Sequence, residues 1–173
     1  AAIAAMQAAT AGKAHWYVRA LPVKYPSGGE KQLIQILTNK EVPSGRRPID
    51  IGIVVQNVGT AFAIAQAVVD DIPLISRVVT VTGDTLRHAQ NLYALVGTPV
   101  SDLLHSCGYQ PAVEQRLIMG GPMMGFTLPD ARIPVVKTTN CIIAPTADEL
   151  PATGPEMDCI RCGACTEACP ASL

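Results

Sequence analysis

Four cysteines lie close together near the end of the sequence: Cys159, Cys162, Cys165 and Cys169. Their spacing, C-x2-C-x2-C-x3-C followed by Pro170, is the run that binds a [4Fe–4S] cluster through thiolates. Such short spacings wrap the backbone around the cluster, and backbone amides of the loop can donate to its sulfur atoms and tune the potential. We therefore expect these four side chains to be iron ligands.

Structural zinc is the alternative occupant of this run. Zinc sites usually separate two C-x2-C pairs by a dozen or more residues, which is not the pattern here. Disulfides are disfavoured because the spacings are too short for good disulfide geometry and no secretory signal precedes them. Cys107 and Cys141 stand apart in apolar surroundings, where we expect buried core positions.

The fourth cysteine of the run has a separate role in ferredoxins that hold two clusters, because it ligates the other cluster. On that pattern Cys159, Cys162 and Cys165 would serve one cluster, and Cys169 a second. The remaining ligands of both would then lie beyond Leu173. Since the sequence also lacks an initiator Met, we expect the chain to be a segment of a longer protein.

Composition excludes two classes of partner. The formal net charge is −1 and aromatic residues make up 4% of the chain, so neither a basic footprint nor base-stacking side chains favour nucleic acid. No apolar run approaches the roughly 20 residues that span a bilayer, so we expect no direct membrane insertion by this chain.

The segments that must position the cysteine run alternate at first between helix and strand. Helices are predicted over 1–11, 30–39 and 57–71, and strands over 15–21 and 49–55. This alternation is typical of an α/β layer.

The pattern changes near Pro73. Strands are predicted within 74–84, 91–97, 115–125 and 132–145. A helix is predicted over 98–108, with Thr98 as N-cap, Pro99 as the first helical residue and Gly108 at the end. Strands crossed by one helix indicate an α+β unit of the β-grasp kind.

The predicted fold class is therefore α/β plus α+β. We expect an α/β domain over 1–72, a β-grasp domain over 73–145, a polar linker rich in Pro and Gly over 146–157, and the start of an iron–sulfur domain over 158–173. The "GGPMMG" segment lacks the lysine and the following helix of a phosphate loop, so we interpret it as a tight structural turn. Arg46 and Arg47 are interpreted as part of a solvated loop.

Four motifs in this order resemble those of the RnfC family: "KYPSGGEKQLI", "VVQNVGT", "LIMGGPMMG" and "CIRCGACTEACP". Members of this family are the C component of the Rnf electron transport complex, a membrane-bound ferredoxin–NAD oxidoreductase that couples electron flow to ion translocation. The resemblance implies a Rossmann-like FMN/NADH domain, of which this chain holds the C-terminal part. It also implies a β-grasp (SLBB) domain and a ferredoxin-like domain with two [4Fe–4S] clusters.

The resemblance further implies where the protein works. Its partners would be the membrane subunits of the complex and ferredoxin or another electron carrier. It would be peripheral, on the cytoplasmic face of the bacterial inner membrane. Its function would be electron transfer between NAD(H), FMN and the clusters. The alternative is a non-catalytic β-grasp module that docks neighbouring subunits or binds a ligand.

FMN-binding residues follow from a resemblance to the flavoprotein subunit of respiratory complex I. It places FMN against the positions Tyr25, Gly28, Gly29, Glu30, Asn57 and Thr60. Two departures are evident: Gln56 stands where those relatives have Asn, and the glycine-rich loop that embraces the FMN phosphate is absent from this chain. We therefore expect this segment alone to bind FMN poorly and to be inactive alone.

Overall fold

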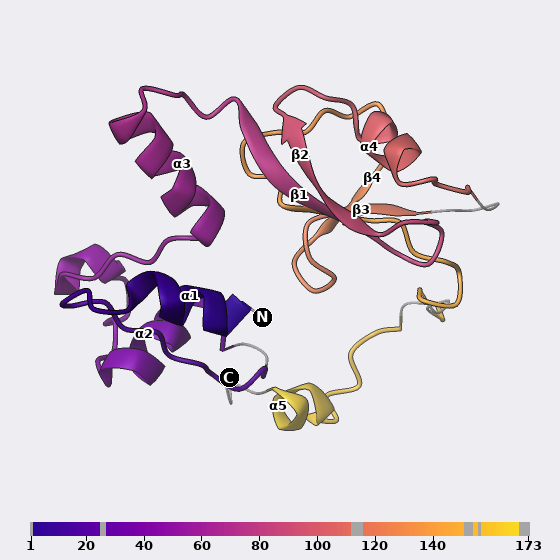
Figure 1. The fold of residues 1–173 in the computed structure, drawn as a ribbon. Helices are drawn as coiled ribbons and strands as arrows, with labels where there is room; N and C mark the ends of the chain where they lie inside the picture. Colours follow the sequence, from indigo (N-terminus) through magenta and orange to yellow (C-terminus); the bar gives the residue numbers. More distant parts are fainter. Residues whose placement is uncertain (1, 25–26, 112–115, 151–153, 156, 170–173) are drawn as a thin grey trace. The chain divides into compact units, whose positions relative to one another are not determined.

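The structure is a computed structural model in which residues 2–24, 27–111, 116–150, 154–155 and 157–169 are described. The chain divides into two compact units. One comprises residues 1–55 and 159–173, and the other comprises residues 56–158. Helices and one mixed sheet make up the described part, which confirms the predicted mixed α/β class. Figure 1 shows the elements of both units.

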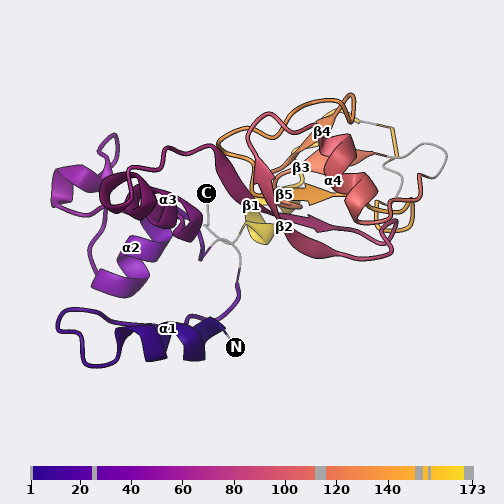
Figure 2. The same cartoon turned by 45° about the horizontal axis from the view of Figure 1, so that its top comes forward.

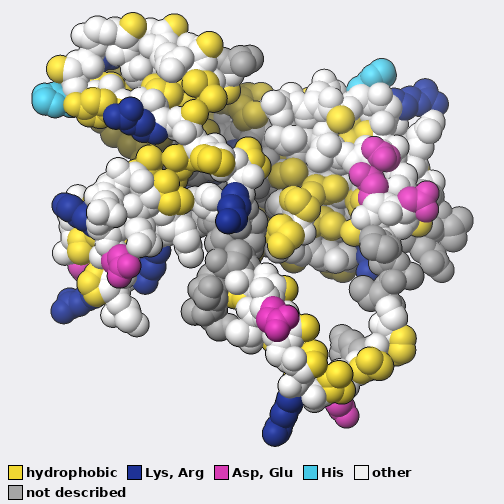
Figure 3. Space-filling view, turned by 90° about the horizontal axis from the view of Figure 1, so that it is seen from below, with side chains coloured by type: hydrophobic (Ala, Val, Ile, Leu, Met, Phe, Trp, Pro, Cys, Tyr) yellow, Lys and Arg dark blue, Asp and Glu magenta, His cyan; other side chains and the backbone are white. Residues whose placement is uncertain are grey.

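The first unit contains helices and no strand in its described residues. These helices are α1 (Ala2–Thr10), α2 (Glu30–Thr38), the 3-10 helix η1 (Pro48–Ile51) and α5 (Ala164–Ala168). Ile34 of α2 and Pro48 of η1 are its buried apolar side chains among the described residues, and Ile34 is 2% exposed. Large apolar side chains elsewhere in the unit are exposed, among them Ile3, Trp16 and Leu37. Hydrophobic side chains are accordingly widespread on the face seen in Figure 3.

The prediction of two strands in this unit is wrong. Residues 15–21 have no regular structure, and residues 49–55 begin in η1 instead of a strand. Local polar groups favour the 3-10 turn: Pro48 opens it, and the backbone N–H of Arg47 donates to the Asp50 carboxylate at 2.9 Å. Gly52 then ends it in a left-handed conformation, with φ of 75°.

The second unit contains α3 (Val58–Val69), α4 (Val100–Ser106) and one five-stranded sheet. Its strands are β1 (Ser76–Thr82), β2 (Gln90–Leu95), β3 (Leu117–Met119), β4 (Phe126–Leu128) and β5 (Cys141–Ile143). The strand order is β2-β1-β5-β3-β4, with β5 parallel to β1 and all other pairs antiparallel. Figure 2 shows α4 lying over the sheet.

The core of this unit lies between α4 and one face of the sheet. Alternation along the strands buries Val79 and Val81 of β1 and Ile142 of β5, each 0% exposed. The buried side chains of α4 that meet them include Val100, Leu103 and Leu104. Cys107 follows α4 and is also 0% exposed, which confirms its predicted core position.

Two details of the sequence-based prediction need correction. Cys141 is only partly buried, because it lies on the strand face opposite to the core residue Ile142. The N-cap of α4 is Pro99, so the helix begins one residue later than predicted. The reason is that Thr98 and Pro99 are held in extended pairing with the segment around Pro134, and the Thr98 carbonyl accepts from the Val135 backbone at 2.8 Å.

A close backbone approach joins the end of β1 to the end of β5. Gly83 has φ of 124°, and a Cβ at this position would lie 2.1 Å from the Ala144 carbonyl oxygen. That same oxygen accepts from the Thr85 hydroxyl, and the Ala144 N–H donates to the Thr82 carbonyl at 2.8 Å. Only glycine fits the first position, so this junction depends on Gly83.

The "GGPMMG" segment connects β3 to β4 as a tight turn. A Cβ at Gly125 would lie 2.6 Å from the Gly121 carbonyl oxygen, so the backbone leaves no room for a side chain there. Farther along, the Glu149 carboxylate accepts from the backbone N–H of Asp84 at 3.1 Å and of Thr146 at 2.9 Å. The residues that follow the sheet are thereby tied to it. None of the helices among the described residues has the length and apolar character to cross a bilayer.

Gly83 and Gly97 form a matched pair for testing the junction. Both have positive φ, 124° and 100°, but nothing lies within 4 Å of a Cβ at Gly97. Gly97→Ala should lose about 1–3 kcal/mol of unfolding free energy from backbone strain alone. Gly83→Ala should lose clearly more, because the Ala144 backbone must also move. Urea unfolding of the two variants measures the difference, and equal losses would contradict the proposed role of the junction.

Candidate functional site

The cysteine run lies on a loop and on the short helix α5. Cys159 and Cys162 precede the helix and Cys165 lies within it; all three are exposed. Cys169 follows the helix and is partly buried, and its backbone N–H donates to the Thr166 carbonyl at 3.3 Å. The run is therefore presented at the surface of its unit.

The backbone turns sharply twice between the first and third cysteines. Arg161 has φ of 56° and Gly163, the N-cap of α5, has φ of 80°, both left-handed. Among the described residues, no three His, Cys, Asp or Glu side chains are gathered closely enough to hold a metal ion. The fit of the run to a cluster rests on its donor chemistry, four thiols on a short turning segment.

The predicted flavin residues fall into two groups. Gly28, Gly29 and Glu30 lie in the first unit, where Gly29 is the N-cap of α2 and Glu30 is its exposed first residue. Tyr25 lies outside the described residues. Asn57 and Thr60 lie in the second unit, at the start of α3. Each group therefore lies at the N-terminus of a helix. Both of these helices were predicted from the sequence.

Asn57 has a structural role of its own. Its side-chain oxygen accepts from the Gly59 backbone N–H at 2.9 Å and so caps α3. The oxygen of the amide is thus engaged, whereas its NH2 group makes no hydrogen bond that the described residues show. A ligand at this position would meet an amide whose orientation is already set by the cap.

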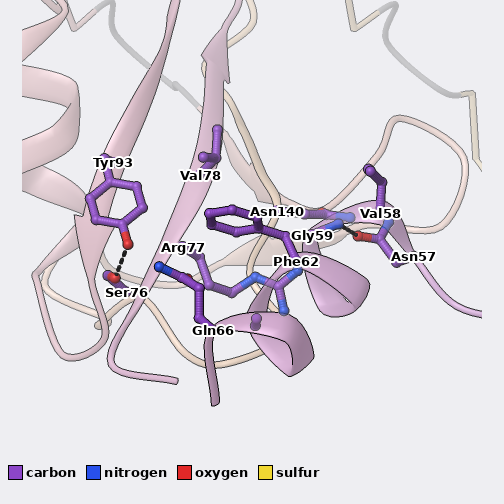
Figure 4. A pocket seen from close by; sticks show the side chains of 11 residues that line it. Asn57, Val58, Gly59, Phe62, Gln66, Ser76, Arg77, Val78, Tyr93 and Asn140 are labelled. Atoms are coloured by element: carbon purple, nitrogen blue, oxygen red, sulfur yellow. Dashed lines mark hydrogen bonds between the residues drawn. The ribbon is translucent and has the colours of Figure 1, made fainter. Parts of the chain in front are cut away.

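A cleft that sequence reasoning did not find lies in the second unit, beside the start of α3 (Figure 4). Its volume is about 230 Å³, and it is bounded by α3 on one side and by β1 and β2 on the other. Its lining residues include Asn57, Phe62, Gln66, Arg77, Tyr93 and Asn140. The sequence signal was too weak to find it, because Val78 and Tyr93 become neighbours only through the register of β1 with β2.

Shifted pKa values occur away from the predicted site residues. Burial raises the pKa of the Cys141 thiol above its ordinary value, so this thiol is less reactive than an exposed one. Burial likewise raises the pKa of Tyr109. The Arg132 guanidinium, which donates to Asp130 at 2.7 Å, lowers the pKa of that exposed carboxyl. None of these groups lies in the cysteine run or in the cleft.

Two parts of the chain match known domain families. Residues 1–66 match the Nuo51 FMN-binding domain, and residues 78–127 match the SLBB domain. The second match runs from within β1 to within β4, in the part of the chain predicted to be of the β-grasp kind.

Similar proteins are named as the C component of an ion-translocating oxidoreductase complex. The Vibrio cholerae protein is 60% identical over 173 residues, which are 99% of this chain and 22% of that protein. The Erwinia tasmaniensis and Cronobacter sakazakii proteins are each 54% identical over 172 residues, 99% of this chain and 21% and 22% of their own lengths. The chain thus spans about a fifth of the length of these relatives. It belongs to the RnfC family of ion-translocating oxidoreductase complexes.

Proposed function

We propose that the protein is an electron-transfer subunit of a membrane-bound, ion-translocating oxidoreductase, passing electrons between NAD(H), FMN and [4Fe–4S] clusters. The observation that carries this proposal is the exposed cysteine run, Cys159, Cys162, Cys165 and Cys169, on a segment that turns at Arg161 and Gly163. It stands in a chain whose relatives are named as subunits of such a complex.

The cysteines would hold iron as thiolates, and a bound cluster would supply one-electron transfer. Because Cys159, Cys162 and Cys165 are exposed, their sulfur atoms are accessible to iron without rearrangement of a packed core. The backbone N–H groups at the start of α5 could donate to sulfur and tune its potential. We assign Cys169 to a second cluster, following the spacing rule of two-cluster ferredoxins.

The predicted flavin-binding residues would hold FMN in position. Gly28 and Gly29 carry no side chain that would block the approach of a flat ring, and Glu30 and Asn57 offer polar groups to its edge. FMN supplies hydride chemistry with NAD(H) when bound. The family match over residues 1–66 supports this assignment.

The partners follow from the same family. We propose that the protein binds the membrane subunits of the complex and exchanges electrons with ferredoxin or a similar carrier, as a peripheral protein on the cytoplasmic face of the inner membrane. The β-grasp unit has a packed core of its own around Ile142 and Leu104, so it could also act as the docking module of the protein.

Cys165→Ser should remove one cluster equivalent of iron and sulfide from the anaerobically reconstituted protein. The reason is that a neutral hydroxyl is a poor ligand for iron compared with a thiolate. Cys141→Ala is the matched control, since this partly buried thiol lies on the sheet and outside the run. Iron and sulfide analysis measures the result. Stoichiometric zinc without sulfide in the unaltered protein would refute the electron-transfer role of the run.

Cys169→Ser tests the division of ligands between two clusters. Each substitution should weaken the EPR signal of one reduced cluster. The cluster affected by Cys169→Ser should differ from the cluster affected by Cys165→Ser. If both substitutions remove the same signal, all four cysteines serve one cluster and the division is wrong.

Asn57→Ser tests the flavin assignment separately from folding. Serine is as good an N-cap as asparagine but lacks the amide N–H donors, whereas Asn57→Ala loses both functions. Stability should fall by about 1 kcal/mol in Asn57→Ala and little in Asn57→Ser. The FMN affinity of the full-length protein, measured by quenching of flavin fluorescence, should fall roughly 3- to 10-fold in both. Unchanged FMN affinity in Asn57→Ser would remove Asn57 from the site.

A further inference from the structure

The cleft between α3 and the sheet has a composition that points to a ligand. Arg77 is the cationic side chain in its lining, and none of the lining residues is an Asp or Glu. The one ion pair between described residues joins Arg132 to Asp130, so no described carboxylate pairs with Arg77. The cleft therefore carries a positive charge that is not neutralised from within.

Arg77 is held in place at this position. Its Nη1 donates to the Lys137 backbone carbonyl, an uncharged partner that fixes the guanidinium without cancelling its charge. Its Nη2 lies near the first turn of α3, since a Cβ at Gly59 would be 3.1 Å from it. Arg77 is partly buried, which strengthens its interaction with an anion relative to one in open solvent. Further guanidinium N–H groups remain to bind oxygen atoms.

Apolar and aromatic side chains form the walls of the cleft (Figure 4). Phe62 comes from α3, and Tyr93 comes from β2 opposite Val78 of β1. These three side chains are 57%, 62% and 55% exposed, so each has apolar surface that a ligand could bury. The Tyr93 hydroxyl is already hydrogen-bonded to the Ser76 hydroxyl at 2.6 Å, which fixes the ring.

The size of the cleft limits what it can hold. Its volume of about 230 Å³ is below the roughly 300–1,000 Å³ that drug-sized ligands occupy. A single aromatic ring with one small substituent suits that volume better than a cofactor with several rings and a phosphate. The three side-chain amides of the lining, Asn57, Gln66 and Asn140, can bind further polar atoms at its rim.

We propose that this cleft binds a small aromatic carboxylate, with the carboxylate on Arg77 and the ring between Phe62 and Tyr93. The occupant is a monocyclic anion, and none of the cleft's lining residues is a cysteine of the run. The inference rests on the charge, walls and volume of the cleft and does not depend on the electron-transfer role proposed above.

Benzoate serves as the probe and benzamide as its neutral counterpart of nearly the same shape. Saturation-transfer NMR and calorimetric titration of the purified protein measure binding of both. We expect benzoate to bind, and benzamide to bind at least tenfold more weakly, because a charged hydrogen bond contributes more than a neutral one. Absence of benzoate binding, or equal affinities for the two probes, would overturn the proposal.

Variants locate the bound probe. Arg77→Met should weaken benzoate binding at least about tenfold, whereas Arg116→Met removes an exposed charge outside the lining and should leave affinity unchanged. Phe62→Ala alters an exposed helix position, so folding should persist while benzoate affinity falls. Unchanged affinity in both Arg77→Met and Phe62→Ala would place benzoate elsewhere and refute the site.

A competition experiment separates this site from that of the flavin. Asn57 lines the cleft and is also a proposed flavin residue, but the proposed contacts of benzoate are Arg77, Phe62 and Tyr93. Saturating FMN should therefore leave benzoate affinity unchanged. Displacement of benzoate by FMN would instead show that the cleft is part of the flavin site. Because this segment alone is expected to bind FMN poorly, the competition uses the full-length protein. Failure of FMN to bind there would affect the proposed electron-transfer role and leave the benzoate result unaltered.

Discussion

The second unit depends on the pairing of β5 with both of its neighbours. β5 is only three residues long, yet it joins the β1–β2 pair to the β3–β4 pair. Ile142 at its centre is fully buried, and the Ala144 carbonyl just beyond it accepts from the Thr85 hydroxyl. Because Gly83 must pass within van der Waals distance of this carbonyl, the end of β1 and the end of β5 are fixed together. The contacts of the Ala144 carbonyl with Gly83 and Thr85 fix the end of this short strand.

The same sheet has an exposed face opposite to its core. The core and α4 occupy one side of the sheet, so Val78 and Tyr93 are left exposed on the opposite side. The cleft lies beside these two side chains, is bounded by α3 and is also lined by Arg77. The first unit differs, since Ile34 and Pro48 are its buried apolar side chains among the described residues. The cysteine run belongs to that unit, and its thiols lie mostly at the surface rather than in a packed core.

Sequence reasoning succeeded where the cause of a structure is local. The helices over 30–39 and 57–71 are confirmed because apolar spacing and the N-cap Asn57 lie within the segments themselves. The strands predicted over 15–21 and 49–55 are wrong because an apolar run becomes a strand only with a partner to pair with, and the described residues of 1–55 contain none. The cleft could not be predicted, since it requires the register of β1 with β2. The cysteine motif was readable from spacing alone, but whether its sulfur atoms gather around iron is not encoded by spacing.

Reduction by NADH tests the central claim most directly. The intact protein, loaded with FMN and iron, would be mixed with NADH without oxygen, frozen and examined by EPR. We expect a signal from a reduced [4Fe–4S] cluster together with bleaching of the flavin absorbance. Bleaching of the flavin without a cluster signal, in a sample whose clusters dithionite does reduce, would contradict electron transfer between the two.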